Sequence, residues 1–187
     1  MIIRVATISD ATKVAELHIE SIRNTYRGIL PDEFLDNQVF QDRFSFWQTE
    51  LASKSDMQRV FIAEEEGKCL GFICVRLNAD PRWGTTIDNV HVLPNEKGKG
   101  IGTQLMEDAT NWILSQAPNS GVWLWSYEQN LNTCHYYEGL RGHNAESHMK
   151  KIRDKYDVMC IRYTWESPDQ LLGFIAEKKS TLSKLMR

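Results

Sequence analysis

A short glycine-rich segment constrains this chain more than any other feature of its sequence. Residues 97–103 read Lys-Gly-Lys-Gly-Ile-Gly-Thr, so three glycines stand at alternate positions. They follow a β-branched run over 85–93 that predicts a strand, and they lead into residues 101–115, whose pattern predicts a helix. Glycines lack a Cβ atom and let a ligand approach the backbone closely. The free N–H groups and the positive dipole end of the helix then favour an anion, and phosphate above all.

The glycine spacing argues against two other kinds of phosphate site. A dinucleotide-binding loop has the pattern GxGxxG after an early strand. In this chain Thr103 occupies the position of the required third glycine, and the preceding strand is a late one. A P-loop needs the pattern GxxxxGK[ST], which the chain lacks. A plain glycine-rich turn is the alternative interpretation of this segment taken by itself.

The order of the predicted elements indicates the fold class. Hydrophobic periodicity predicts a strand and three helices, then a hairpin, then strands that alternate with helices, and a final hairpin. This order is typical of an α+β protein with a mixed sheet. The predicted strands cover 2–7, 60–64, 70–77, 85–93, 122–127, 148–149 and 158–165. The predicted helices run from a cap at Ser9 or Asp10 to Thr25, and over 32–37, 41–53, 101–115 and 131–140.

The end of the chain predicts one more helix. Ser167, Pro168 and Gln170 fit the N-cap, first and third positions of a capping box. Apolar residues then recur at near-helical spacing, namely Leu171, Leu172, Ile175, Leu182, Leu185 and Met186. We therefore predict a domain over 1–166 and a C-terminal amphipathic helix over 167–187. That helix packs on its own domain or, alternatively, on the partner subunit of a homodimer.

Composition and charge exclude several classes of protein. The chain has 187 residues, of which 42% are hydrophobic and 25% charged, which suffices for a buried core. Its net charge of −3 does not indicate a basic surface that would bind duplex nucleic acid, so no nucleic-acid partner is expected. No run approaches 18 apolar residues and no signal peptide precedes the first strand, so we expect a cytoplasmic protein without a membrane partner. The cysteines and histidines lack metal-ligand spacing, and no metal is expected.

Four segments resemble motifs of the GCN5-related N-acetyltransferases, the GNAT family. Residues 97–102, Lys-x-x-Gly-x-Gly, resemble the family loop [Arg/Gln]-x-x-Gly-x-[Gly/Ala]. Residues 90–94, Val-His-Val-Leu-Pro, are similar to its strand end LYVxP, and residues 130–138 are similar to its helix NxxAxxFYE. Residues 4–31 look like the N-terminal region of many bacterial members. Because the four segments occur in the family's order and at its distances, the resemblance covers residues 2–165.

The resemblance implies a mostly antiparallel GNAT-type sheet and acetyl-CoA as co-substrate. An acetyl group would pass to a primary amine, of a small molecule or a peptide, by direct attack in a ternary complex. Backbone groups of 90–92 would bind the pantetheine arm as an added strand does, and 97–103 would hold the diphosphate. Asn130 would hydrogen-bond the pantetheine, and Tyr137 would protonate the departing thiolate. The implied coenzyme-binding residues are Val90, His91, Val92, Lys97, Gly98, Lys99, Gly100, Ile101, Gly102, Thr103, Asn130 and Tyr137.

The general base and the acceptor site depend on departures from the family pattern. Some members place a glutamate base at the positions matched here by Thr86 or Trp125, and neither residue can serve as a base. Asp88 lies two residues from Thr86 on the same strand face and is the candidate base, with a hydrogen-bonding strand aspartate as the alternative. Tyr26 and Arg27 match the region that shapes the acceptor site. Four tryptophans are candidates for lining an acceptor cleft, with a core role as the alternative, namely Trp83, Trp123, Trp125 and Trp165.

A second interpretation of function follows from the same departures. Without the two glutamates, the chain could be an acyl-CoA-binding sensor or regulatory module of the same fold that transfers nothing. The presence of Asn130 and Tyr137 favours the enzyme. The sequence does not specify which amine is the acceptor.

Overall fold

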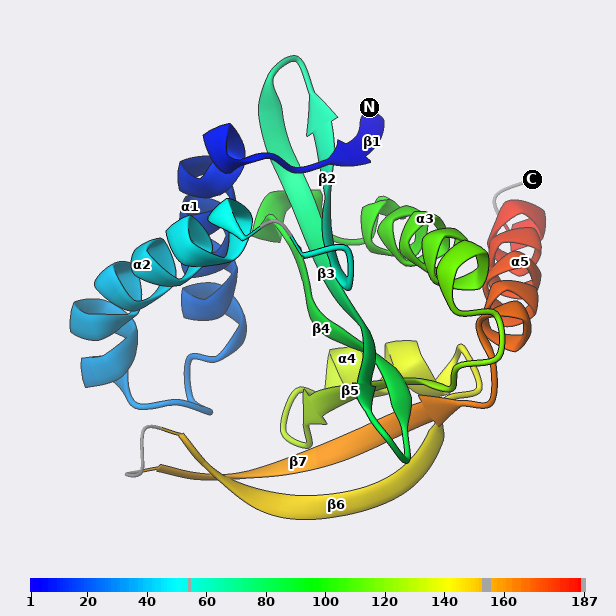
Figure 1. The fold of residues 1–187 in the computed structure, drawn as a ribbon. Coiled ribbons are helices and arrows are strands. Elements are labelled where there is room, and N and C mark those ends of the chain that lie inside the picture. Colours follow the sequence, from blue (N-terminus) through cyan, green and yellow to red (C-terminus); the bar gives the residue numbers. More distant parts are fainter. Residues whose placement is uncertain (54, 153–155, 186–187) are drawn as a thin grey trace. The chain divides into compact units, whose positions relative to one another are not determined.

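The computed structural model describes residues 1–53, 55–152 and 156–185 and shows an α+β fold (Figure 1). Its strands are β1 (Ile2–Val5), β2 (Gln58–Glu65), β3 (Lys68–Asp80), β4 (Gly84–Val92), β5 (Val122–Tyr127), β6 (His143–Ile152) and β7 (Tyr156–Trp165). Its α-helices are α1 (Ala11–Thr25), α2 (Val39–Ala52), α3 (Ile101–Gln116), α4 (Leu131–Glu138) and α5 (Pro168–Leu185). Within the described residues, the seven strands form one sheet in the order β1-β2-β3-β4-β5-β7-β6. The β4–β5 pair is parallel and the pairs β1–β2, β5–β7 and β6–β7 are antiparallel, which confirms the predicted class.

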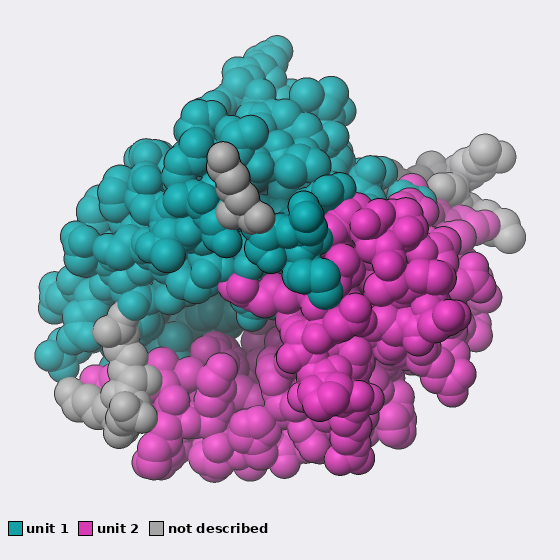
Figure 2. Space-filling model, viewed as in Figure 1, with its two compact units in different colours: residues 1–75, 88–108 teal, residues 76–87, 109–187 magenta. Residues whose placement is uncertain are grey.

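The chain forms two compact units, which Figure 2 shows in different colours. Unit 1 comprises residues 1–75 and 88–108, and unit 2 comprises residues 76–87 and 109–187. The helix α5 belongs to unit 2. The division into a domain over 1–166 and a separate C-terminal helix stays a prediction.

Alternating side chains of β3 organise the packing of unit 1. The ring centroid of Phe72 lies 5.3 Å from that of His18 on α1 and 4.9 Å from that of Trp47 on α2. At the preceding residue, Gly71, the direction that a side chain would take is toward the opposite face of the strand. A Cβ atom at Gly71 would lie 3.1 Å from Cδ1 of Leu105 on α3 and 2.9 Å from the backbone oxygen of His91. The strand therefore meets α1 and α2 on one face and the start of α3 on the other.

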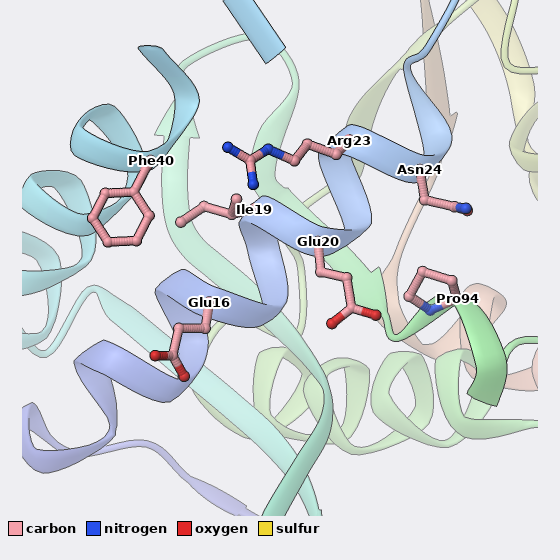
Figure 3. Close-up of a pocket in the computed structure, with 7 residues that line it drawn as sticks. All are labelled: Glu16, Ile19, Glu20, Arg23, Asn24, Phe40 and Pro94. Carbon is pink, nitrogen blue, oxygen red and sulfur yellow. The ribbon is translucent and has the colours of Figure 1, made fainter. Parts of the chain in front are cut away.

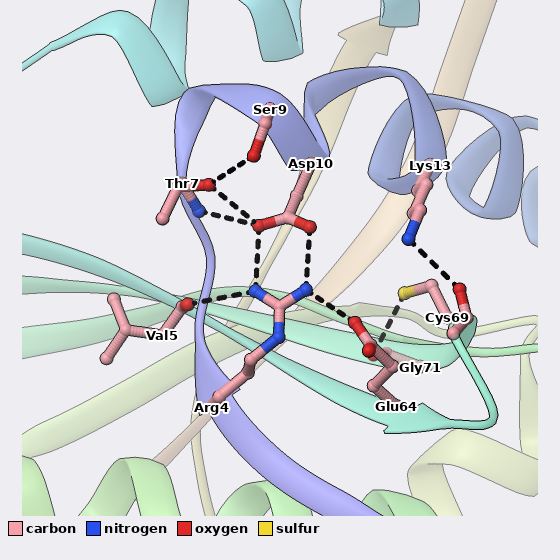
Figure 4. Close-up of polar contacts among 10 residues, drawn as sticks. Arg4, Val5, Thr7, Ser9, Asp10, Lys13, Glu64, Cys69 and Gly71 are labelled. Carbon is pink, nitrogen blue, oxygen red and sulfur yellow. Dashed lines mark hydrogen bonds and ion pairs between the residues drawn. The ribbon is translucent and has the colours of Figure 1, made fainter.

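An ion-pair network fixes the start of the chain to β2 and α1 (Figure 4). Both terminal nitrogens of Arg4 donate to the carboxylate of Asp10 at 2.8 Å, and Arg4 also pairs with Glu64. The backbone N–H of Thr7 donates to the same Asp10 carboxylate at 2.8 Å. The hydrogen bonds from Arg4 hold the pKa of the buried Asp10 well below its usual range. Asp10, one of the two predicted N-cap residues, thus bonds back to Thr7 and Arg4, and within the described residues its side chain makes no cap bond to α1.

The second predicted helix is not a separate element. Residues 32–52 are helical without a break, because a π-helical turn over Phe34–Gln38 leads directly into α2. The backbone N–H of Val39 donates to the oxygen of Phe34, five residues earlier. Leu35 and Val39 are both fully buried, so the buried face of the helix continues through this turn. The gap predicted between residues 37 and 41 is wrong for this reason.

Unit 2 is built on the antiparallel strands β5, β7 and β6, of which β6 and β7 form a long hairpin (Figure 1). The strand β6 spans ten residues, whereas the sequence predicted only 148–149. On β5, Val122, Leu124 and Ser126 are buried on one face, and the tryptophans between them are half-buried on the other. The helix α4 packs on the first of these faces, since Sγ of Cys134 lies 3.7 Å from Oγ of Ser126.

The C-terminal helix makes its described contacts within unit 2. Leu171 and Ile175 are fully buried. Arg141 pairs with Glu177 at 2.6 Å, and its guanidinium lies 4.9 Å from the ring centroid of Phe174. The side chains of Leu182 and Leu185, and all of Met186, lie outside the described residues, and the homodimer stays a prediction. In the part of the chain that the structure describes, no helix has the length and apolar character that crossing a membrane requires.

Candidate functional site

The glycine-rich segment forms an open loop between β4 and α3. A 3₁₀ turn over Pro94–Glu96 follows β4, and the backbone then takes left-handed conformations at Gly98 (φ +80°) and Gly100 (φ +85°). The helix α3 begins at Ile101, and the N–H of Gln104 makes a helical bond to the oxygen of Gly100 at 3.0 Å. The N–H groups of a first helical turn have no acceptor within the helix. The loop therefore ends at the positive end of a 16-residue helix.

The three glycines of this loop differ in what they require. Beyond the chain neighbours, a Cβ atom at Gly98 or Gly100 would meet no atom of the described residues within 4 Å, so backbone conformation, not crowding, requires glycine at these two positions. A Cβ atom at Gly102 would lie 3.7 Å from Cγ2 of Val92, which is an ordinary contact. Residues 97–100 are exposed. The loop thus presents bare backbone to solvent at Gly98 and Gly100.

Two lysines flank the loop with different partners. Nζ of Lys97 donates to Oγ1 of Thr25 at 2.8 Å, near the end of α1. Lys97 is exposed as a residue, but partial burial of its ammonium group against α1 lowers its pKa. Nζ of Lys99 pairs with Glu96 at 2.8 Å and stays largely in solvent. Both predicted diphosphate-binding lysines therefore lie on unit 1 beside the glycines.

The strand end over 90–92 has its central side chain turned into unit 1. Nδ1 of His91 lies 2.9 Å from Oγ of Ser21, and the imidazole lies 4.2 Å from that of His18 between ring centroids. Burial, and then the charge of Lys97, lower the pKa of His91 to about 3. Burial also lowers the pKa of His18 well below its ordinary value, and Trp47 Nε1 donates to His18 Nδ1 at 2.9 Å. This buried pair of neutral histidines joins α1, α2 and β4, a role that the sequence did not indicate.

The predicted base and acceptor residues also lie on unit 1. Asp88 is an exposed residue of β4. Tyr26 follows the last residue of α1, and its backbone oxygen accepts a hydrogen bond from the N–H of Leu30 at 2.8 Å. Arg27 pairs with Asp36 at 2.7 Å and with Asp32 at 2.8 Å, which raises the pKa of its guanidinium. Arg27 thus closes the loop between α1 and the helix that follows it.

Asn130 and Tyr137 lie on unit 2, before the start and near the end of α4, and the four predicted tryptophans lie on the same unit outside α4. Asn130 precedes α4, and its backbone oxygen accepts the N–H groups of Thr133 and Cys134, both at 3.0 Å. Tyr137 is 6% exposed. Its ring centroid lies 5.7 Å from that of Tyr163 and 6.2 Å from that of Trp165. The phenol is therefore held by rings of β7.

An open pocket on unit 1 is lined by residues other than the predicted site residues (Figure 3). Its volume is about 570 Å³, and Figure 3 shows Glu16, Glu20 and Arg23 on α1 beside it. The guanidinium of Arg23 already has a hydrogen-bond partner, because its Nε donates to the backbone oxygen of Leu35 at 2.8 Å. The cavity is lined by Glu16, Ile19, Glu20, Arg23, Asn24, Phe40 and Pro94. Tyr26 and Arg27, predicted for the acceptor, are not among these lining residues.

Metal ligands do not gather in the described parts of the chain. Over residues 1–53, 55–152 and 156–185, no three histidine, cysteine, aspartate or glutamate side chains are placed to hold a metal ion. The described cysteines are all buried thiols. Cys134 is among them, with Sγ at 3.5 Å from the backbone oxygen of Tyr127.

Comparison with known sequences identifies one family. The model of the "Acetyltransferase (GNAT) family" matches residues 19–142, which include the glycine-rich loop and α4. The uncharacterized N-acetyltransferase YuaI of Bacillus subtilis (strain 168) is 23% identical over 164 residues, which cover 86% of this chain and 87% of YuaI.

Solved structures share the fold. The structure of PaiA N-acetyltransferase from Thermoplasma acidophilum, in complex with coenzyme A, has a TM-score of 0.65 and 20% identity over 88% of this chain and 100% of that one. The structure of yncA from Salmonella typhimurium, a putative acetyltransferase with its cofactor acetyl-CoA, has a TM-score of 0.64 and 17% identity over 89% of this chain and 93% of that one. At these identities the likeness concerns the fold.

Proposed function

This chain belongs to the Acetyltransferase (GNAT) family, and we propose that it transfers an acetyl group from acetyl-CoA to a primary amine by direct attack in a ternary complex. The acceptor would be the amine of a small molecule or of a peptide. Membership of this family identifies the chain in general terms as a GNAT acetyltransferase. The coenzyme, the mechanism and the roles of individual residues are the proposal.

The main evidence that the chain binds acetyl-CoA is the open loop between β4 and α3. Apart from their chain neighbours, the described residues place no atom within 4 Å of the Cβ positions of left-handed Gly98 and Gly100, so a diphosphate could approach this backbone without a clash. The start of α3 would supply N–H groups and the positive end of its dipole. The ammonium groups of Lys97 and Lys99 add positive charge beside the loop. Backbone groups of Val90, His91 and Val92 would bind the pantetheine arm.

The amine must lose a proton before it attacks. A lysine-like amine has a pKa near 10.4, so freeing it at pH 7 costs about 4.6 kcal/mol. A base must accept this proton directly or through water. Asp88 is the proposed base, because it is an exposed carboxylate on β4.

The thiolate of coenzyme A must gain a proton as it leaves. A free phenol has a pKa of about 10 and is therefore protonated at pH 7. Passing its proton to a thiolate, whose thiol has a pKa of about 8.5, costs only about 2 kcal/mol. Tyr137 is the proposed acid, and its contacts with Tyr163 and Trp165 would keep the ring in one orientation. Asn130, at the other end of α4, would hydrogen-bond the pantetheine.

A thiol-release assay with a panel of amines tests this function. The purified chain would be incubated with acetyl-CoA and a polyamine, amino acids, an aminoglycoside, an N-terminal peptide and a lysine peptide. The proposal expects release of free coenzyme A with at least one amine and an acetylated product by mass spectrometry. Binding of acetyl-CoA without turnover on any amine would contradict the enzyme and support the regulatory module.

A further inference from the structure

A buried arginine in unit 2 is surrounded by three tryptophans. The guanidinium carbon of Arg162 on β7 lies 4.2 Å from the ring centroid of Trp123, 4.3 Å from that of Trp125 and 5.0 Å from that of Trp83. Arg162 is the register partner of Trp125, so both project from the same face of the sheet. This is the face of β5 opposite to the face that holds Ser126 and α4. We call Arg162 and the three tryptophans the indole cluster.

One side of the guanidinium in the indole cluster lacks a hydrogen bond. Nε of Arg162 donates to Oε1 of Glu146 on β6 at 2.9 Å. Nη1 is buried, and among the residues that the structure describes none accepts a hydrogen bond from it. Arg162 as a whole is 8% exposed. Indole faces attract a cation but offer no in-plane lone pair to an N–H group. A buried donor without an acceptor is rare and destabilising, so this atom needs an explanation.

One member of the indole cluster, Trp83, lies outside the strands. Trp83 lies in the turn between β3 and β4, where the N–H groups of Arg82 and Trp83 donate to Asp80 Oδ1 at 2.7 and 2.9 Å. The guanidinium of Arg82 lies 4.3 Å from the ring centroid of Trp83. All three tryptophans are half-buried, so the cluster borders solvent. Nη1 is covered in this structure, so a ligand would reach it only after the indole of Trp83, which lies in a turn, has rotated aside.

The local charges determine which ligand suits Nη1. Glu146 already balances Arg162, and Asp80 is adjacent to Arg82, so two carboxylates stand against two guanidiniums. A ligand carboxylate would add an unbalanced charge to a partly desolvated site, which is costly. A neutral carbonyl oxygen would accept the N–H of Nη1 without that cost. The flat faces of the indoles suit an apolar or planar group beside the carbonyl.

We propose that the indole cluster is a binding site for a neutral amide, with the carbonyl oxygen on Nη1 of Arg162 and the adjoining apolar group against Trp83, Trp123 and Trp125. This proposal does not require that the chain transfers an acetyl group. Glu146 holds the guanidinium in place and, by balancing its charge, selects an amide over a carboxylate.

The test compares two probes of nearly the same shape, 3-phenylpropanamide and 3-phenylpropanoate. Binding to the full chain would be followed by NMR of the indole N–H signals, assigned with single tryptophan-to-phenylalanine variants. We expect saturable shifts of the cluster signals and at least tenfold tighter binding of the amide. Absence of saturable shifts with the amide, or equal affinity for both probes, would overturn the proposal.

Three variants separate binding at Arg162 from damage to the fold. Arg162→Met should lose amide binding at least tenfold, whereas Arg82→Met, which removes the exposed guanidinium on Trp83, should change it less than twofold. Glu146→Gln should reverse the preference, so that the carboxylate binds more tightly than the amide. That reversal does not follow from a loss of stability. An unchanged preference in folded Glu146→Gln protein would contradict the assigned role of the charge balance.

Discussion

Nζ of Lys97 lies 2.8 Å from Oγ1 of Thr25, so the first residue of the glycine-rich loop is bonded to the last residue of α1. The loop that we propose for the diphosphate is thereby connected to the helix that precedes Tyr26 and Arg27. The same ammonium group would have to serve both Thr25 and a phosphate oxygen. An ammonium group has three donors, so it can make both bonds at once.

Replacing Lys97 by methionine separates these two roles. A hydrogen bond to a charged group contributes about 1.5–3 kcal/mol, so Lys97→Met should raise the Kd for acetyl-CoA about tenfold or more. Thr25→Val removes only the bond to α1 and should change the Kd less than threefold. Isothermal titration of the three proteins measures both values. Equal losses in the two variants would mean that Lys97 acts through α1 and not on the coenzyme.

Replacing Tyr137 by phenylalanine should lower turnover more than coenzyme affinity. The ring contacts with Tyr163 and Trp165 remain, but the proton for the thiolate is lost. General acid catalysis contributes typically about 10²–10⁴-fold, so we expect kcat to fall at least tenfold while Kd stays within about threefold. Tyr136→Phe is the matched control, since its ring is the direct neighbour at 5.5 Å. Equal kcat values for Tyr137→Phe and the unchanged protein would remove the acid role.

The network around Asp10 predicts how stability depends on acid. Hydrogen bonds from Arg4 lower the pKa of Asp10 in the folded chain, while an unfolded aspartate titrates near 3.9. The contribution of Asp10 is therefore complete above about pH 4 to 5 and is lost as the pH falls below about 4 towards the folded pKa.

Urea unfolding of Asp10→Asn at several pH values measures this effect. At pH 7 the variant should be less stable by about 1.5 kcal/mol or more, because Arg4 loses a charged partner. The difference should shrink as the pH is lowered from 5 to 3. A difference that is constant over this range would show that the charge of Asp10 does not stabilise the fold.

The imidazole of His91 should stay neutral throughout the physiological range. Burial lowers its folded pKa to about 3, whereas an unfolded histidine titrates near 6.5. The unfolded chain therefore binds more protons between pH 6.5 and 3, and the contribution of His91 to stability falls as the pH drops through this window. NMR of the ring C–H protons should show no titration of His91 between pH 8 and 5. A midpoint near 6.5 would contradict the buried, neutral state.

The strand, loop and helix around the glycines could be predicted from the sequence because each has a strong local signal. The predicted strand 85–93 and helix 101–115 differ from β4 and α3 by one residue at their ends. The strand β6 was predicted only at 148–149, because its side chains are mostly exposed and polar and show no alternation. Its hairpin partner β7 holds it in the sheet, because backbone pairing with β7 does not require apolar residues to alternate along β6.

The sites that the sequence did not indicate depend on contacts between distant strands and helices. Trp123 and Trp125 alternate on β5, but their meeting with Arg162 follows from the register of β5 and β7. His18 and His91 are 73 positions apart and meet because α1 packs against β4. A periodic pattern predicts which face of an element is buried and does not specify which residue it meets there.

Calorimetric titration of acetyl-CoA into the full chain tests whether the glycine-rich loop binds the coenzyme. The measurement would compare the unchanged protein with Gly100→Val and Gly102→Ala. Gly100 has a φ of +85° and open space at its Cβ position, whereas a Cβ at Gly102 makes only an ordinary contact with Val92. We expect saturable binding by the unchanged protein, little change in Gly102→Ala, and at least a tenfold higher Kd in folded Gly100→Val. No detectable binding by the unchanged protein, or the same Kd in Gly100→Val, would contradict this expectation.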